Sequence, residues 1–169
     1  SAGFAEVGPE GRRHQERITA IARDAGMSLV GPNCMGLMDI RRNFFPTFAP
    51  IFGFNGEARP KPGNISLVSQ SGAFGAHAYE LVRARGAGFS KWVTTGNQCD
   101  VEVSDFVAYM ADDKSTDVIM VYFEGNRDAD KLMAAFRKAR ENGKPVVLLK
   151  AGRSETGVKA AVSHTGSMA

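Results

Sequence analysis

Cysteine is scarce in this sequence, with only Cys34 and Cys99 among 169 residues. Two cysteines cannot build the disulfide framework of a small secreted protein, and they fit a reducing compartment. Their spacing, with no histidine or further cysteine nearby, also excludes the common metal-binding patterns. We therefore expect a cytoplasmic protein with no metal site in this chain. Cys99 is expected to pack in the core, whereas Cys34 lies in a turn that a ligand can reach.

Long apolar runs and blocks of basic residues are missing as well. No stretch approaches the ~20 apolar residues that a membrane span needs. The net charge is only +3, and no run of Lys or Arg alternates with aromatic residues. Neither nucleic acid nor a membrane is therefore expected as a partner. Hydrophobic residues at 43% and charged residues at 23% are ordinary for a globular protein, which argues against disorder.

The sequence instead alternates short apolar runs with amphipathic stretches, which is typical of an α/β domain with a mostly parallel sheet. Helices are predicted around five strands, which cover residues 27–30, 65–68, 89–94, 118–123 and 146–149. Residues 39–63 follow neither period and are predicted to form a loop or linker. The expected fold is a doubly wound parallel sheet in three layers (α/β/α). Such sheets bind ligands at the carboxyl ends of their strands.

Clusters of small and polar residues fall at those strand ends: Ser69–Gly72, Gly96-Asn97, Glu124-Gly125 and Lys150–Gly152. The first cluster leads into a helix whose first backbone N–H groups have no partner inside the helix. Together with the helix dipole, they make a ready phosphate site. In the alternative interpretation, Ser71 only caps its own helix and Gly72 allows close packing. The turn is not a P-loop, because no Gly-Lys-Ser/Thr follows.

Three histidines and one glutamate are the candidates for chemistry. His14 lies among charged residues and is expected to be exposed, and His77 is expected to be structural. His164 precedes Thr and Gly, where it is a nucleophile, a general base or a bystander. Glu124 ends the apolar strand 118–123 at the mouth of the crevice. It either orients an imidazole and stabilises its charged form, or it caps the next helix.

Five motifs occur in order along the chain: Gly31-Pro32-Asn33-Cys34-Met35-Gly36, Leu67-Val68-Ser69-Gln70-Ser71-Gly72, Gly96-Asn97, Phe123-Glu124-Gly125 and Ser163-His164-Thr165-Gly166. Together they resemble the nucleoside-diphosphate-forming acyl-CoA synthetases, the superfamily of succinyl-CoA synthetase and ADP-forming acetyl-CoA synthetase. The resemblance implies that residues 1–38 are the tail of a Rossmann-like CoA-binding domain and 39–62 a linker. Residues 63–169 resemble the flavodoxin-like ligase domain, truncated at its C-terminal end, so we expect a fragment of a larger protein.

The resemblance also implies a role for each site residue. In the family a histidine is phosphorylated during turnover, and His164 stands at its position with Glu124 as the glutamate that steadies it. The helix terminus that receives the phosphate corresponds to Ser71, Gly72 and Ala73. The residues expected near CoA and substrate are Asn33, Cys34, Gly96 and Asn97.

The ligands implied by the resemblance are CoA, a carboxylic acid and phosphate. ATP or ADP and Mg²⁺ would bind to an ATP-grasp domain or β subunit outside this chain, and the parent protein is expected to be an oligomer. Acetate, succinate and larger acids all stay open as acyl groups, as do ADP and GDP. One alternative is the acyl-CoA-sensing domain of a protein acetyltransferase, against which the His164–Glu124 pair argues. A flavin carrier is the other, but the sequence shows no aromatic pair to sandwich a flavin.

Overall fold

The regular elements expected after residue 60 are all present in the computed structural model, which describes residues 2–49, 59–125 and 127–152. Strands and helices alternate along this part of the chain: β2 (Pro62–Ser69), α2 (Gly72–Ala84), β3 (Phe89–Thr94), α3 (Val103–Asp112), β4 (Val118–Phe123), α4 (Ala129–Glu141) and β5 (Val146–Lys150). The sequence prediction of strands separated by amphipathic helices is confirmed there.

In the first forty residues the helix expected between Gly8 and Gly26 is present, but the strands differ from the prediction. A short 3₁₀ helix η1 (Ala5–Val7) and a helix α1 (Pro9–Asp24) lead to a three-residue strand β1 (Leu37–Asp39) that was not predicted. The predicted strand over 27–30 is wrong, because that segment forms only one bridge, between Val30 and Val101. Its backbone groups bond to the turn around Asp100 instead of to a strand ladder.

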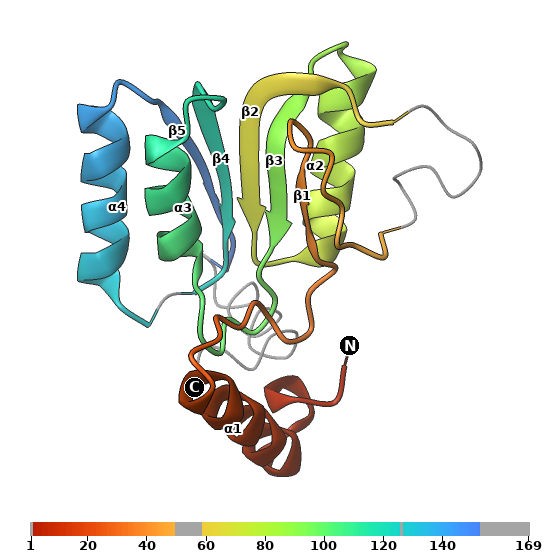
Figure 1. Ribbon diagram of the computed structural model, residues 1–169, viewed down its shortest axis with the longest axis vertical. Coiled ribbons are helices and arrows are strands. Elements are labelled where there is room, and N and C mark those ends of the chain that lie inside the picture. The colour runs from red at the N-terminus through yellow and green to blue at the C-terminus, as the bar shows by residue number, and fades with distance from the viewer. Residues whose placement is uncertain (1, 50–58, 126, 153–169) are drawn as a thin grey trace.

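The strands form one sheet in the order β1-β3-β2-β4-β5 (Figure 1). β1 runs antiparallel to β3, and the other neighbours are parallel. From β2 the chain first winds to β3 on one side and then crosses to β4 on the other. The strand order therefore reverses at β2, which places the topological switch point between the carboxyl ends of β2 and β4.

Helices cover both faces of the sheet. On one face α2 packs against β2 and β3, and its Tyr79 is buried in one cluster with Trp92 and Leu67 of the sheet. On the other face α3 and α4 lie side by side over a cluster that includes Val107 and Ile119 (Figure 1). The three-layer, flavodoxin-like arrangement predicted from the sequence is confirmed. Helix α1 lies beyond the carboxyl ends of the strands (Figure 1).

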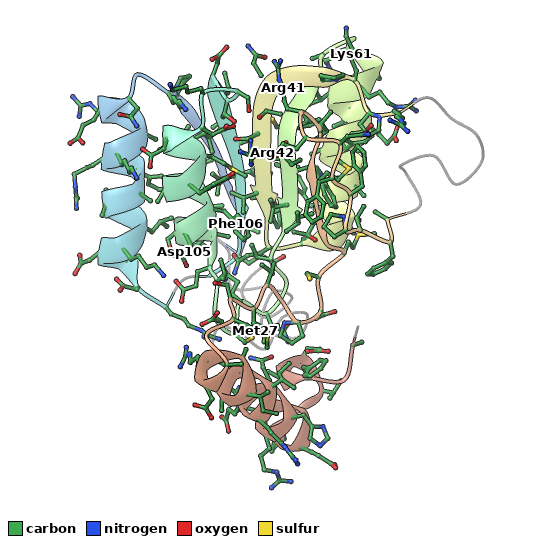
Figure 2. The ribbon with its side chains drawn as sticks, viewed as in Figure 1. Met27, Arg41, Arg42, Lys61, Asp105 and Phe106 are labelled. Atoms are coloured by element: carbon green, nitrogen blue, oxygen red, sulfur yellow. The ribbon has the colours of Figure 1, made fainter. Side chains whose placement is uncertain are left out.

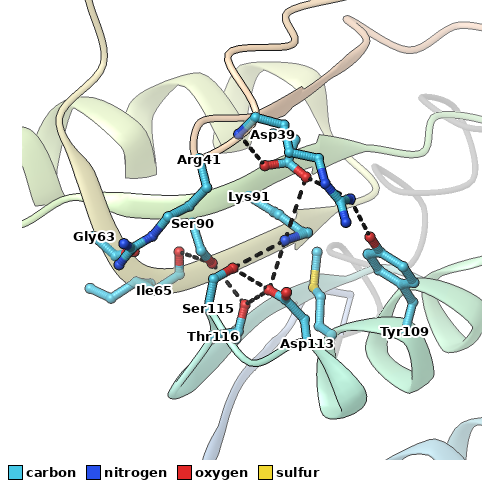
Figure 3. Close-up of polar contacts among 12 residues, drawn as sticks. Asp39, Arg41, Gly63, Ile65, Ser90, Lys91, Tyr109, Asp113, Ser115 and Thr116 are labelled. Atoms are coloured by element: carbon cyan, nitrogen blue, oxygen red, sulfur yellow. Dashed lines mark hydrogen bonds and ion pairs between the residues drawn. The ribbon is translucent and has the colours of Figure 1, made fainter.

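The opposite, amino end of the sheet contains a buried ionic cluster (Figure 3). Lys91 of β3 is 5% exposed, and its Nζ lies 2.7 Å from Asp113 Oδ2 and 3.6 Å from Asp39 Oδ2. Ser115 and Thr116 also donate hydrogen bonds to Asp113 Oδ2. Burial works in the opposite direction, but the hydrogen bonds from Lys91, Ser115 and Thr116 hold the pKa of Asp113 well below its ordinary value.

The surface around this amino end carries basic side chains. Figure 2 shows Arg41 and Lys61 there, whereas Met27 lies at the other end of the sheet, near α1. Lys61 Nζ donates to the Gly86 carbonyl oxygen, 2.6 Å away, and an Arg41 Nη2 hydrogen bond reaches the Gly63 carbonyl oxygen. These side chains therefore fasten the loops where strands begin.

Candidate functional site

Two turns lie next to each other at the switch point. One follows β2 and begins at Gln70, and the other follows β4 and begins at Glu124. Ser69 and Tyr122 are partners in the parallel ladder, so the two strands reach the edge of the sheet at the same level. The candidate site is therefore built from the residues directly after these two strands.

The turn after β2 starts the helix as the sequence predicts. Ser71 is the N-cap of α2, and its Oγ accepts a hydrogen bond from the Phe74 backbone N–H at 3.2 Å. Ser69 Oγ donates to the Ser71 carbonyl oxygen at 2.6 Å, which fixes the turn from the strand side. The capping role of Ser71 is thus real. It leaves the first N–H groups of the helix, at Gly72 and Ala73, directed out of its end.

Two glycines at the start of α2 are closely packed. A Cβ on Gly72 would lie 2.6 Å from Met35 Cγ, so the helix terminus is in close contact with the segment that contains Cys34. A Cβ on Gly75 would lie 3.1 Å from Thr94 and 3.2 Å from Trp92, because the first turn of α2 sits directly on the sheet. Small residues therefore allow the helix terminus to approach both neighbours closely.

Glu124 is buried at the end of β4, with 5% of its surface exposed. It does not cap the next helix, because the N-cap of α4 is Asp128, which accepts from the Lys131 backbone N–H at 2.9 Å. Burial, followed by the charge and the hydrogen bond of Glu124, raises the pKa of the Tyr122 hydroxyl. The Tyr122 ring stacks on Phe74 with centroids 4.1 Å apart, which joins Glu124 to the first turn of α2.

Two side chains that the sequence analysis did not assign to the site hold the Glu124 turn. Gln70 is 2% exposed, and its Oε1 accepts from the backbone N–H groups of both Glu124 and Gly125. Its Nε2 donates to the Gly125 carbonyl oxygen at 3.0 Å. From the other side, Lys150 Nζ donates to the Glu124 carbonyl oxygen at 2.6 Å. The turn is therefore bound by one side chain that directly follows β2 and by one at the end of β5.

The four residues expected near CoA and substrate come together in a second pair of turns. Gly96 has a φ of 54° and packs so tightly that a Cβ would lie 2.4 Å from the Asn33 carbonyl oxygen. Asn33 Nδ2 lies 3.4 Å from Asn97 Oδ1, and Cys34 beside it is partly exposed. Asn97 is buried, and its Nδ2 donates to two side chains of the N-terminal helices, Glu6 Oε2 and Gln15 Oε1.

A positively charged hollow of about 430 Å³ lies between α1 and these strand ends. Its lining contains three arginines and one glutamate among the residues Arg12, Gln15, Glu16, Thr19, Ala20, Arg23, Cys99 and Arg127. Burial raises the pKa of the Cys99 thiol, which agrees with the predicted core position of this residue. The excess of guanidinium groups favours the approach of anions to this end of the molecule.

Of the histidines, His14 on α1 and His77 on α2 are both exposed. His164 lies outside the described residues. Within those ranges, no group of three or more His, Cys, Asp or Glu side chains is placed to hold a metal ion. No helix in the described part of the chain has the length and apolar character needed to cross a membrane.

Comparison with known proteins gives a consistent result. Residues 62–169 match the family model described as the succinyl-CoA ligase like flavodoxin domain. The whole chain is 43% identical to an ADP-forming acetate–CoA ligase I of Archaeoglobus fulgidus and 39% identical to the α subunit of an ADP-forming acetate–CoA ligase II of Pyrococcus furiosus. It spans 24% and 35% of the lengths of these two relatives.

The fold is likewise found in a solved structure. An acetyl-coenzyme A synthetase 1 of Candidatus Korarchaeum cryptofilum, in complex with phosphate and ADP, superposes with a TM-score of 0.86 at 32% identity. The superposition covers 100% of this chain and 35% of that protein. The similarity therefore extends over residues 1–61, which precede the family match, as well as over the sheet.

Proposed function

This chain belongs to the nucleoside-diphosphate-forming acyl-CoA synthetases, and we propose that it carries half of their phosphoryl-transfer site. The parent enzyme interconverts acyl-CoA, ADP and phosphate with a carboxylic acid, CoA and ATP. The observation that carries the proposal is the junction at the switch point, where the N-terminus of α2 and the buried Glu124 are joined through Gln70. A helix N-terminus suited to an anion and a carboxylate thus follow two neighbouring strands at the switch point.

The N-terminus of α2 is the proposed seat of the transferred phosphate. The backbone N–H groups of Gly72 and Ala73 and the Ser71 hydroxyl supply donors, and the helix dipole adds a positive field. Gly72 lets a phosphate approach the backbone closely. The arginine-lined hollow beside the strand ends raises the local concentration of anionic substrates.

Glu124 is proposed to act through His164. Phosphate attacks the thioester carbonyl of acyl-CoA, the C–S bond breaks, and CoA leaves with an acyl phosphate formed. An imidazole nitrogen of His164 then attacks phosphorus and the carboxylate leaves. Glu124 accepts a hydrogen bond from the other ring nitrogen, which holds the ring in place and stabilises the positive charge that the phosphorylated imidazole carries.

The nucleotide is proposed to bind to a partner domain or β subunit, as the α-subunit relative from Pyrococcus furiosus suggests. Mg²⁺ bound with that nucleotide would neutralise phosphate charge during transfer. Residues near Asn33 and Cys34 would face the CoA thiol, because their turn contacts Gly72 through Met35. A cytoplasmic, oligomeric parent enzyme fits this division of the site between domains.

Phosphorylation of His164 is the test of this function. The full-length parent protein, incubated with labelled ATP, should give an acid-labile, base-stable phosphoprotein, and His164→Ala should remove the label. His77→Ala is the matched control, because His77 is exposed on α2, and it should keep the label. Label that persists in His164→Ala would refute the proposal. A wild-type protein that binds acyl-CoA but never becomes labelled would instead support the sensing module.

A further inference from the structure

The hydrogen bonds of the Gln70 side chain all go to the turn that follows β4. Its Oε1 accepts the Glu124 and Gly125 N–H groups, the latter at 3.0 Å, and its Nε2 donates to the Gly125 carbonyl oxygen. Its own backbone N–H donates to the Tyr122 carbonyl oxygen at 3.1 Å. With 2% of its surface exposed, Gln70 has no contact with bulk water that would compete with these bonds.

Because of its position in the chain, Gln70 connects two turns through these hydrogen bonds. It stands immediately before Ser71, the N-cap of α2, and 54 residues before Glu124. The same residue therefore fixes the start of the phosphate-binding helix through its backbone and the Glu124 turn through its side chain. If one of the two turns moves, the hydrogen bonds of Gln70 carry that movement to the other turn.

We propose that Gln70 is a positioning residue that sets the Glu124 turn beside the N-terminus of α2. The role rests on the proposed function of this site. Gln70 does not contact the reacting atoms, and it acts by holding Glu124. The amide supplies an acceptor for two N–H groups together with a donor for a carbonyl oxygen. Glutamate keeps the acceptors and loses the donor, and methionine keeps the length and loses both.

Gln98 is a matched control within the same chain. It is also buried, at 5% exposure, and its Oε1 accepts from the Val103 backbone N–H at 2.7 Å. It follows β3 as Gln70 follows β2, but it holds the start of α3 and not the Glu124 turn. Gln98→Met therefore removes one buried side-chain hydrogen bond, against three in Gln70→Met, without touching the Glu124 turn.

The first experiment uses the present chain. The pKa of the Glu124 carboxyl is followed by ¹³C NMR in wild type, Gln70→Met, Gln70→Glu and Gln98→Met. Gln70→Glu should raise that pKa, because a second carboxylate beside Glu124 disfavours its charged form. Gln70→Met should shift the Glu124 and Gly125 amide signals. Gln98→Met should leave all of these unchanged. A Glu124 that is insensitive to both Gln70 variants would overturn the proposal.

The second experiment uses the parent enzyme and measures kcat and KM for acyl-CoA. Gln70→Met should lower kcat by about 10²-fold, the scale of a small misplacement of a catalytic group, with KM changed less than about threefold. Gln70→Glu should recover part of the lost kcat, and the acid limb of its kcat–pH profile should move to higher pH. Equal losses in Gln70→Met and Gln98→Met would contradict positioning. A wild-type enzyme that forms no phosphohistidine would refute the proposed function alone, since the NMR result on Glu124 stands independently.

Discussion

The two ends of the sheet both bury charged side chains, but they hold them in different ways. At the amino end, Lys91 faces Asp113 and Asp39 directly, side chain to side chain (Figure 3). At the carboxyl end, the buried Glu124 interacts with the neutral Tyr122 hydroxyl, and its backbone is held by Gln70, which follows β2, and by Lys150 of β5.

This difference indicates that the charged residues at the amino end serve stability and that Glu124 serves the reaction. A charge that is paired with a fixed partner interacts only weakly with a substrate. If that charge is removed, its partner stays unpaired in a low dielectric. A carboxylate that is bonded to a neutral hydroxyl keeps its charge and can still accept a hydrogen bond from an incoming imidazole. We therefore expect substitutions at the amino end to cost folding free energy, and conservative substitutions at the carboxyl end to cost turnover.

Lys91→Met should give the largest loss of stability. It removes the cation that pairs with the partly buried Asp113 and leaves Asp39 with only the exposed Arg42, and removing one partner of a buried pair costs about 3–5 kcal/mol. For a chain of this size, that corresponds to a fall in Tm of roughly 10 °C. Urea and thermal denaturation measure it, with the exposed Lys114→Ala as control. Adding Asp113→Asn to Lys91→Met should restore part of the loss, and a Tm within 2 °C of wild type (a threshold of about half a kcal/mol) would show that the cluster is not a stability device.

Glu124→Gln should have the opposite profile. The amide preserves shape, so Tm should move little, whereas turnover of the parent enzyme should fall by about 10²-fold or more because the imidazolium loses its counter-charge. Steady-state assays and thermal melts on the same preparations give both numbers. The exposed Glu141→Gln serves as control. Normal turnover with a lowered Tm would show that Glu124, like Lys91, contributes to stability and not to turnover.

The pH dependence of stability should come from the amino end. The pKa of Asp113 is depressed in the folded state, so its contribution is fully present above the unfolded value of about 3.9 and is lost as pH falls toward the folded value. The free energy of unfolding should therefore decline below about pH 4, and more steeply in wild type than in Lys91→Met. Urea titrations from pH 6 to pH 2.5 test this expectation. Parallel curves for the two proteins would contradict it.

Ser71→Ala should give the smallest effect. Loss of the N-cap costs about 1 kcal/mol, and phosphate binding should weaken only modestly, because the backbone of Gly72 and Ala73 supplies most of the donors. Asp128→Ala removes the equivalent cap of α4 and is the matched control for stability. A phosphate affinity that falls more than about tenfold in Ser71→Ala would show that the hydroxyl, and not the helix terminus, is the main ligand.

The sequence predicted the elements after residue 60 because each carries a clear period and ends at glycine or a polar cap. Ser71 as N-cap and Glu124 at the end of β4 follow from the same local patterns. β1 was missed because three antiparallel residues are too short to show a period, and their partner lies more than fifty residues away. Gln70 and Lys150 were missed as site residues for a similar reason. Their hydrogen bonds to Glu124 span 54 and 26 residues and end on backbone atoms, which leave no pattern in the sequence.

Titration of the ¹⁵N-labelled chain with inorganic phosphate tests most directly whether phosphate binds at the carboxyl end of the sheet and not at the amino end. The account predicts saturable shifts of the amide signals of Gly72 and Ala73, with smaller shifts at Glu124 and Gly125, while the signals of Lys91 and Asp113 stay in place. Shifts centred on the arginine-lined hollow, or on the amino end of the sheet with Gly72 and Ala73 unmoved, would contradict the assignment of the phosphate to the N-terminus of α2.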